Sequence, residues 1–447
     1  MRMRWLAAPL ALALVLGACA TDDDNGADPA PEDTTDAPDD ADDADDEAAA
    51  DPDADAEPVT LSMWTFTGMN LDDLVSQYEE ANPHVTVQIQ TTEHGDHHDA
   101  LFTELAAGGG PDIAAIEVAF INEMAQQNQL WRNLYDYGAA DIEGDFLDWK
   151  IEQAQNVDGD HLIGIPTDIG GMAMAYRWDL FEEAGLPTDR DEVSELWVDS
   201  WQDFIEVGAE YTEATGRGFV DNESNLWNAV VNQDPETFFD ADGNPIFDQS
   251  DQVQYAWDVV VDAHEAGIIA EVPAWSAEWE AGMSHGSFAV IGAPAWMMGY
   301  IMDVAPDTEG NWDLAEVPEA GGNWGGSHLG VPSASDNPEE AYALIEWLLS
   351  PENQLYQFTE YGQFPSIPEL FDTEEVQNFE NAFFNNAPVG PIYADNAERV
   401  VAQNTGPNYN SIDDEFQNGL GRIIDGAESP EEAWESTINN VRGQLGL

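Results

Sequence analysis

A regular alternation of strand-like and helix-like patterns opens the body of this chain and constrains its fold more than any other feature. Residues 59–64 and 85–89 are predicted as β-strands, and 111–116 as a short buried strand. Apolar residues at helical spacing between the first two strands predict a helix over 71–78, and a second helix is expected at 98–107. This order is typical of a parallel sheet, so the sequence predicts an α/β fold.

Further helices are expected along the rest of the chain, at 200–215, 251–267, 338–349, 413–425 and 430–445. The last of them begins with Ser429 and Pro430, a helix cap followed by a first-turn proline. With 447 residues, of which 43% are apolar, the chain can bury one large core or two moderate ones. Wholesale disorder is therefore excluded.

The first 18 residues are typical of a signal peptide. Arg2 and Arg4 precede an apolar run at 5–16 that is too short to span a bilayer, and small residues lead to Cys19. This order resembles a bacterial lipoprotein signal, which predicts lipidation of Cys19 and anchoring at the extracellular face of the cell membrane. The alternative is a simple secretory signal with an accidental cysteine. Cys19 is the only cysteine, so intramolecular disulfides are excluded.

Acidic residues dominate the composition. Residues 19–58 hold 18 of the 91 acids with no base and no aromatic residue, so this segment is predicted to be an acidic disordered tether. Residues 59–447 keep the other 73 acids against only eight bases. Such a charge repels nucleic acid and anionic membrane surfaces, so neither is an expected partner. Acids in place of lysine over a whole surface are typical of proteins that work in concentrated salt.

Five short motifs follow one another along the body, at 78–85, 106–113, 164–187, 282–296 and 325–341. The most specific begins with the sequence GIPTDIGG at 164–171 and continues through MAMAYR at 172–177. In this order the motifs resemble the family 1 extracellular solute-binding proteins, the sugar-binding lipoproteins of ABC importers. One departure is Arg177-Trp178, where that family often has a lysine.

The resemblance implies a two-lobed α/β fold of the periplasmic-binding-protein (type II) kind, with a hinge between the lobes. The lobes are expected to comprise 59–167 with 324–366, and 168–323 with 367–447. The chain is expected to cross between them near 166–168, 321–326 and 365–370. A ligand then lies between the lobes at the carboxyl ends of strands, and closure around it creates the form that a permease recognises.

Aromatic and acidic residues supply the candidate ligand contacts. Sugar rings need flat aromatic platforms for their C–H faces and carboxylates or amides for their hydroxyl groups. Glu117 follows a strand and Asp168 lies in the predicted hinge, while Trp64, Trp296 and Trp324 are expected in loops. The candidates are Trp64, Glu93, Glu117, Asp168, Trp227, Trp275, Trp296, Trp324 and Tyr409. The alternative for any one tryptophan is plain packing in the core.

Two segments have the residue types of a metal site. Residues 93–98 contain three histidines that could ligate zinc, although Asp96 or His97 also suits the cap of the following helix. Residues 240–244 resemble a calcium loop but have no glycine at the sixth position, so a hairpin turn is favoured. No metal and no cofactor is expected.

The leading functional hypothesis is a non-enzymatic receptor that delivers a neutral sugar, an oligosaccharide above all, to an ABC permease. A monomer is expected. An extracellular glycoside hydrolase is the alternative, since it also uses paired carboxylates and aromatic residues. A binding protein for a polyol, a glycerol phosphodiester or a metal is a third hypothesis. Anionic ligands are disfavoured because the body has few bases to pair with them.

The acidic surface predicts that stability depends on salt. Because the Debye length falls to ~3 Å at about 1 M salt, repulsion between the acids is screened there and strong at low ionic strength. The melting temperature should therefore rise between about 0.05 and 2 M sodium chloride. A melting temperature that stays flat over this range would contradict the hypothesis of a salt-adapted protein.

Overall fold

The computed structural model describes residues 57–319 and 321–447, so the signal segment, Cys19 and nearly all of the predicted tether lie outside the described residues. A five-stranded sheet comprises β1 (Val59–Phe66), β2 (Val85–Thr92), β3 (Ile113–Glu117), β4 (Gly164–Pro166) and β9 (Ser327–Gly330). The strand order is β2-β1-β3-β9-β4. β1 pairs in parallel with β2 and β3, whereas β9 runs antiparallel to β3 and β4. The predicted parallel α/β beginning is confirmed.

Three helices connect or follow the parallel strands: α1 (Asp72–Ala81), α2 (His94–Ala106) and α3 (Val118–Gln126). Two boundaries differ from the prediction. β1 continues to Phe66, because Thr65 pairs with Thr91 in register and their hydroxyl groups are hydrogen bonded at 2.8 Å. α2 begins four residues early, so Glu93 is its N-cap residue in place of the predicted Asp96 or His97.

A second, three-stranded sheet has the order β7-β6-β8 and is antiparallel throughout. Its strands are β6 (Met172–Arg177), β7 (Val290–Pro294) and β8 (Trp312–Ala315). The helices between these strands are α5 (Trp178–Ala184), α6 (Arg190–Glu195), α7 (Trp201–Thr215), α8 (Glu223–Val231), α9 (Asp251–Glu265), α10 (Ala277–His285) and α11 (Ala295–Val304).

Short segments carry the chain from one sheet to the other. β5 (Asp168–Ile169) follows β4 and pairs antiparallel with β10 (Phe364–Pro365), so two predicted crossing segments run side by side. The remaining α-helices are α4 (Asp148–Gln153), α12 (Pro338–Leu348), α13 (Pro351–Tyr361), α14 (Glu374–Gln377), α15 (Val389–Ala397), α16 (Tyr409–Ile424) and α17 (Pro430–Leu445). Short 3-10 helices lie at Asn128–Leu130, Leu134–Tyr137, Ala139–Asp141, Glu143–Asp145, Pro306–Thr308, Pro368–Leu370 and Ala382–Phe384.

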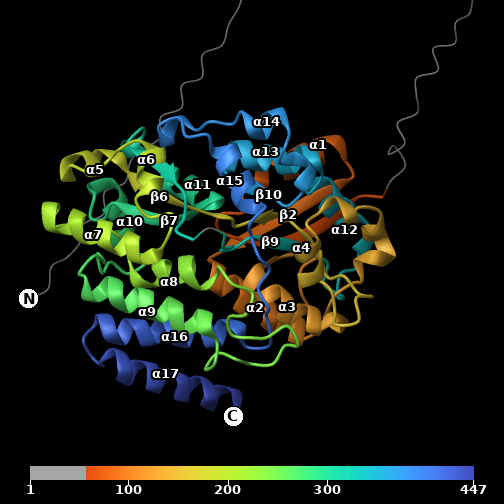
Figure 1. Cartoon of the computed structure of the whole chain (residues 1–447). Coiled ribbons are helices and arrows are strands. Elements are labelled where there is room, and N and C mark those ends of the chain that lie inside the picture. Colours follow the sequence, from red (N-terminus) through yellow and green to blue (C-terminus); the bar gives the residue numbers. More distant parts are fainter. Residues whose placement is uncertain (1–56, 320) are drawn as a thin grey trace, which may run out of the picture. The chain divides into compact units, whose positions relative to one another are not determined.

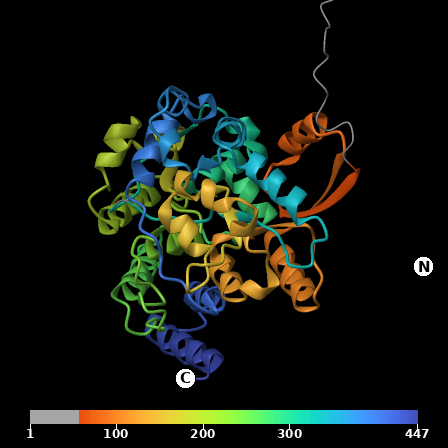
Figure 2. The ribbon, with the colours of Figure 1, turned by 90° about the vertical axis from the view of Figure 1, so that its right-hand side faces the viewer.

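The C-terminal helices α16 and α17 lie together beside α8 and α9, at the bottom of both views (Figures 1 and 2). α17 begins as predicted: Ser429 and Glu432 form a capping box, and Pro430 occupies the first turn. Within the described part of the chain, no helix is both long and apolar enough to cross a membrane.

The two sheets have separate hydrophobic clusters. Leu61, Ile113 and Leu329 belong to the cluster of the five-stranded sheet and are fully buried. Both faces of the three-stranded sheet are covered, and β6 shows how: Met174 belongs to one cluster and Ala175 to another. Because successive side chains of a strand point to opposite faces, a strand buried on both sides is largely apolar, as residues 172–176 of β6 are.

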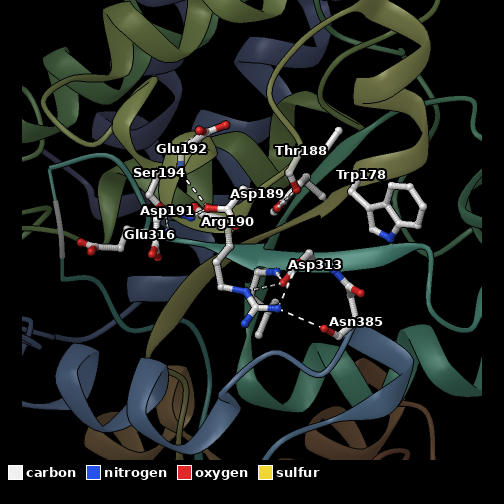
Figure 3. Close-up of polar contacts among 12 residues, drawn as sticks. Trp178, Thr188, Asp189, Arg190, Asp191, Glu192, Ser194, Asp313, Glu316 and Asn385 are labelled. Carbon is white, nitrogen blue, oxygen red and sulfur yellow. Dashed lines mark hydrogen bonds and ion pairs between the residues drawn. The ribbon is translucent and has the colours of Figure 1, made fainter.

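A charged contact joins three elements around the three-stranded sheet (Figure 3). The guanidinium of Arg190, at the start of α6, donates to both carboxylate oxygens of Asp313 in β8, at 2.9 and 3.1 Å. Asn385 donates to the same carboxylate at 2.9 Å and accepts from Arg190 at 3.1 Å through its carbonyl. The Asp313 side chain is only 2% exposed, so its charge depends on these partners.

Replacing Arg190 should test this contact. Arg190→Met leaves the buried Asp313 carboxylate without its cation, and removing one partner of a buried pair costs about 3 kcal/mol in the free energy of unfolding. Arg217→Met is the matched control, because Arg217 and Glu183 form an exposed pair at 3.0 Å and such pairs contribute less than about 1 kcal/mol. Urea denaturation at constant salt measures both values. Equal losses in the two variants would contradict the assignment.

Candidate functional site

The carboxyl ends of β1, β2 and β3 lie at one edge of the five-stranded sheet, because the three strands run parallel. Thr67 follows β1, Glu93 follows β2, and Glu117 is the last residue of β3. The hydroxyl of Thr67 donates to the Glu93 carboxylate at 3.3 Å. Two of the predicted site acids, Glu93 and Glu117, therefore stand at the same edge.

Glu117 has an environment unlike that of a surface acid. It is the N-cap of α3, and its carboxylate accepts a hydrogen bond from the Ala119 N–H at 2.7 Å. Only 13% of its side chain is exposed. Burial raises the pKa of Glu117 to about 7, although the Ala119 N–H and the positive charge of Lys150 act in the opposite direction. The carboxyl group is therefore close to half protonated at neutral pH.

Asp168 is the third predicted acid, and it lies in β5 between the two sheets. Its side chain is buried and accepts hydrogen bonds from the Thr167 hydroxyl at 2.6 Å and from the Ser327 N–H at 3.0 Å. Burial raises the pKa of Asp168, while Lys150 and these hydrogen bonds oppose the increase. The carboxylate thus joins the outgoing and returning segments of the chain.

Two of the three histidine side chains of α2, those of His97 and His98, have partners in the backbone. His98 Nδ1 contacts the His94 carbonyl at 2.8 Å, and its Nε2 accepts from the Glu117 N–H at 3.1 Å, which places the ring proton on Nδ1. His97 Nε2 contacts the carbonyl of Ala115 at 2.8 Å. Burial lowers the pKa of His98 to about 2 and that of His94 to about 4, so both rings are neutral. No group of three or more potential metal ligands occurs among residues 57–319 and 321–447.

Five aromatic side chains gather on the side of the three-stranded sheet, and we call them the aromatic cluster: Trp275, Trp279, Trp296, Tyr300 and Trp324. The rings of Trp275 and Trp296 are stacked at 6.1 Å and 22°. Trp324 packs edge-on against Trp296 at 5.4 Å. Tyr300 and Trp279 contact Trp275 at 5.4 and 4.9 Å. Three of the predicted tryptophans, from three different segments of residues 275–324, are thus brought together.

The backbone around this cluster is unusual. Trp275 is 49% exposed and has a φ of +61°, a conformation that costs a bulky residue about 1–3 kcal/mol and is found mostly at functional sites. The Trp296 indole N–H donates to the Trp324 carbonyl at 3.0 Å. A Cβ at Gly325, whose φ is +94°, would lie only 2.8 Å from that indole nitrogen. Glycine therefore allows the loop to approach the ring.

The aromatic cluster has polar neighbours that the sequence analysis does not predict. The Trp279 indole N–H donates to the buried Asp221 carboxylate at 2.7 Å, and Asn225 donates to the same oxygen. Burial raises the pKa of Asp221 to about 7, against the effect of these hydrogen bonds. The Tyr300 hydroxyl donates to Glu280 at 2.9 Å. The cluster thus combines ring faces with carboxylate acceptors.

The sheet-edge acids lie within electrostatic reach of the opposite side. The charge of Glu93 contributes to the raised pKa of Tyr300, after burial and its hydrogen bond to Glu280. The pKa of Tyr409 is raised mainly by burial, with a contribution from Glu117. Asn410 of α16 also donates to a backbone carbonyl of α3 at 3.2 Å. Residues of the two sides therefore face one another here.

Three other predicted aromatic residues lie in different surroundings. Trp64 is within β1, not in a loop, and packs half-buried against the cluster of the five-stranded sheet. Trp227 is fully buried, stacks on Phe416 at 5.6 Å and leaves no ring face exposed. Tyr409 is buried at the first turn of α16. Trp296 was also expected in a loop but is the second residue of α11, where the helix holds its ring in the cluster.

A separate hollow of about 780 Å³ lies along α8 and α16. Its lining includes Glu223, Asp414 and Arg422 and is polar apart from one glycine. This surface has acceptors but no aromatic platform for a ligand. The aromatic cluster and the facing acids are therefore the better candidate site.

Comparisons with known proteins place the chain in a family. Residues 73–384 match the sequence profile of the bacterial extracellular solute-binding proteins, and the chain belongs to this family. The arabinooligosaccharide-binding protein of Halalkalibacterium halodurans is 24% identical over 412 residues, which cover 86% of this chain and 89% of the relative. The lactose-binding protein of Rhizobium radiobacter is 24% identical over 413 residues, covering 87% and 93%.

Solved structures show the same fold. A crystal structure described as an extracellular solute-binding protein of family 1 is 36% identical, with a TM-score of 0.77 over 86% of this chain and 98% of that one. A transporter-associated binding protein from B. animalis subsp. lactis, in complex with β-1,6-galactobiose, is 18% identical with a TM-score of 0.74, covering 87% and 98%. These findings confirm the predicted family and the two-lobed periplasmic-binding-protein fold.

The raised pKa of Glu117 predicts a pH-dependent stability. Because its pKa is about 7 in the folded protein and 4.5 ordinarily, its contribution is fully present below about pH 4.5 and is lost as the pH rises through 7. Glu117→Gln keeps an acceptor for Ala119 but cannot ionise. The variant should therefore be more stable than wild type by about 3 kcal/mol at pH 8 and about equally stable at pH 4. Urea denaturation between pH 4 and pH 8 measures this difference in the free energy of unfolding. A difference that is the same at every pH would contradict the raised pKa of Glu117.

Proposed function

We propose that this chain captures a neutral sugar, an oligosaccharide above all, between its two lobes and delivers it to an ABC permease. The observation that carries the proposal is the aromatic cluster with carboxylate acceptors beside it. Stacked indole rings suit the C–H faces of sugar rings, and carboxylates accept from their hydroxyl groups. The relatives named for arabinooligosaccharides, lactose and β-1,6-galactobiose support a carbohydrate ligand.

In this proposal Trp275, Trp296 and Trp324 are the ring platforms, and Glu93 and Glu117 are acceptors facing them. Asp168 belongs to the segment about which the lobes 59–167 with 324–366 and 168–323 with 367–447 close. A non-enzymatic role is favoured because the named relatives are binding proteins. Closure around the ligand would require about 5 kcal/mol of differential affinity for the closed form.

We also propose that Cys19 carries the lipid that holds the mature chain at the extracellular face of the membrane as a monomer. The family is extracellular, and a permease in the same membrane needs its receptor nearby. Mass spectrometry of the membrane-bound chain should find a lipid-modified cysteine at its N-terminus. We expect the Cys19→Ala variant to be released into the medium, whereas the wild-type protein stays on the cells.

A screen of ligands tests the central proposal. Melting temperatures measured in concentrated salt with neutral mono- and oligosaccharides should rise for the bound sugar, because a ligand of the folded state stabilises it by mass action. Small-angle scattering with the same sugar should show compaction. Appearance of shorter sugars during incubation would instead indicate a glycoside hydrolase, and a response to no sugar at all would remove the proposal.

Trp296→Ala should weaken binding of that sugar by more than about tenfold, because the variant loses a stacking platform at the centre of the cluster. Isothermal titration calorimetry measures the affinity, and circular dichroism checks that the fold is intact. Trp347→Ala is the matched control: this half-buried tryptophan lies in α12, where its ring contacts Tyr78 at 5.3 Å. Equal affinity of the Trp296 variant and wild type would remove Trp296 from the site.

A further inference from the structure

Lys150 is the only lysine of the chain, and its position is unusual. It lies in α4 with its side chain fully buried, and its ammonium group donates no hydrogen bond within residues 57–319 and 321–447. Nζ lies 5.6 Å from the ring centroid of the neighbouring Trp149. An unpaired buried ammonium group is costly, and an apolar residue of similar size is usually at least as stable. Folding alone therefore gives no reason for a lysine here.

The ammonium group lies where the chain returns to the five-stranded sheet. A Cβ at Gly326 would be 3.1 Å from Lys150 Nζ and 2.6 Å from the Asp168 carbonyl, and φ of this glycine is +90°. The next residue, Ser327, pairs in register with Glu117 and donates its N–H to the Asp168 carboxylate at 3.0 Å. Glycine thus leaves room for the ammonium group beside two of the site acids.

Lys150 is one positive group beside two acidic groups, Asp168 and Glu117. Glu117 and Asp168 both act on the ammonium group, and burial lowers the pKa of Lys150 to about 8, so it is mostly charged at pH 7. His328 contacts the Lys150 carbonyl at 3.0 Å through Nε2, and burial keeps its pKa well below the ordinary value. That ring is therefore neutral.

The other groups that face Glu117 supply no positive charge at neutral pH. His94 Nε2 lies 3.9 Å from the carboxylate, and His98 accepts from the Glu117 N–H, but both rings are neutral. Tyr409 faces it from α16 as a neutral phenol. Of the described residues that act on the charge of Glu117, Lys150 is the cation.

We propose that Lys150 is a positioning residue that holds about half of the Glu117 carboxyl groups in the ionised form at neutral pH, so that this form accepts hydrogen bonds from ligand hydroxyl groups. The inference rests on the proposed function in that Glu117 faces the ligand. Lys150 does not itself touch the ligand, because its side chain is fully buried. With a neutral residue at this position, Glu117 would be protonated at neutral pH. Its side chain would then be a neutral carboxylic acid in place of a carboxylate acceptor.

Carbon-13 NMR of the glutamate carboxyl groups in the ligand-free protein tests the electrostatic step. The Glu117 signal is assigned by its absence in Glu117→Gln. In Lys150→Met its titration midpoint should rise by about one pH unit or more, since a nearby opposite charge shifts a carboxyl group by about that much. Lys150→Arg, which keeps the charge, and Arg217→Met, which removes an exposed one, should leave the midpoint near the wild-type value.

The affinity for the sugar found in the screen tests the consequence. At pH 7 the affinity of Lys150→Met should be lower by about tenfold, and it should recover as the pH rises through the shifted midpoint. An unchanged midpoint in a folded Lys150→Met protein, or an affinity loss that is the same at every pH, would overturn the proposal. If the methionine variant does not fold, Lys150→Gln repeats the test; failure of both neutral variants to fold would make Lys150 a structural residue and also overturn it.

If no sugar binds, the proposed function fails, and the midpoint in the ligand-free protein still shows whether Lys150 controls the ionisation of Glu117. The two failures are therefore distinguishable.

Discussion

The insertion of β9 between β3 and β4 is the constraint on which the rest of the structure depends. This returning strand closes the five-stranded sheet with antiparallel pairs on both sides. Its first residue, Ser327, also donates to the Asp168 carboxylate on the outgoing segment. One strand thereby fixes where the chain leaves the first sheet and where it comes back, and it sets Glu117, Asp168 and Lys150 close together.

Local patterning predicted much of the fold. The order of strands and helices over 59–116 was visible because apolar periodicity follows from which face is buried. The ends of elements were less certain: Thr65 can continue a strand when a partner such as Thr91 is available, and only pairing reveals that. The lobe boundaries stay a prediction. Near one of them, Phe364 packs in a cluster of the three-stranded sheet, whereas Ile367 and Leu370 pack in the cluster of the five-stranded sheet.

The members of the aromatic cluster were predicted in part. Trp275, Trp296 and Trp324 are predicted because tryptophans near glycine and proline are unusual in a core. The prediction of Trp227 as a ligand contact fails to separate it from core residues, because its indole ring is fully buried. Tyr300 follows Trp296 by four residues on α11, a spacing that places both on one helix face and could have revealed it. The place of Lys150 could not be predicted, because its neighbours come from segments far away in sequence.

The packing of the aromatic cluster has an optical consequence. Three indoles with centroids between 5.4 and 6.5 Å apart are close enough for their electronic transitions to couple. Trp275 is the half-exposed member of this group. A molecule that covers its ring, or changes the ring's orientation, therefore alters the near-ultraviolet circular dichroism and the fluorescence emission of all three coupled indoles. The protein therefore carries a built-in, label-free reporter of what occupies its surface at that point.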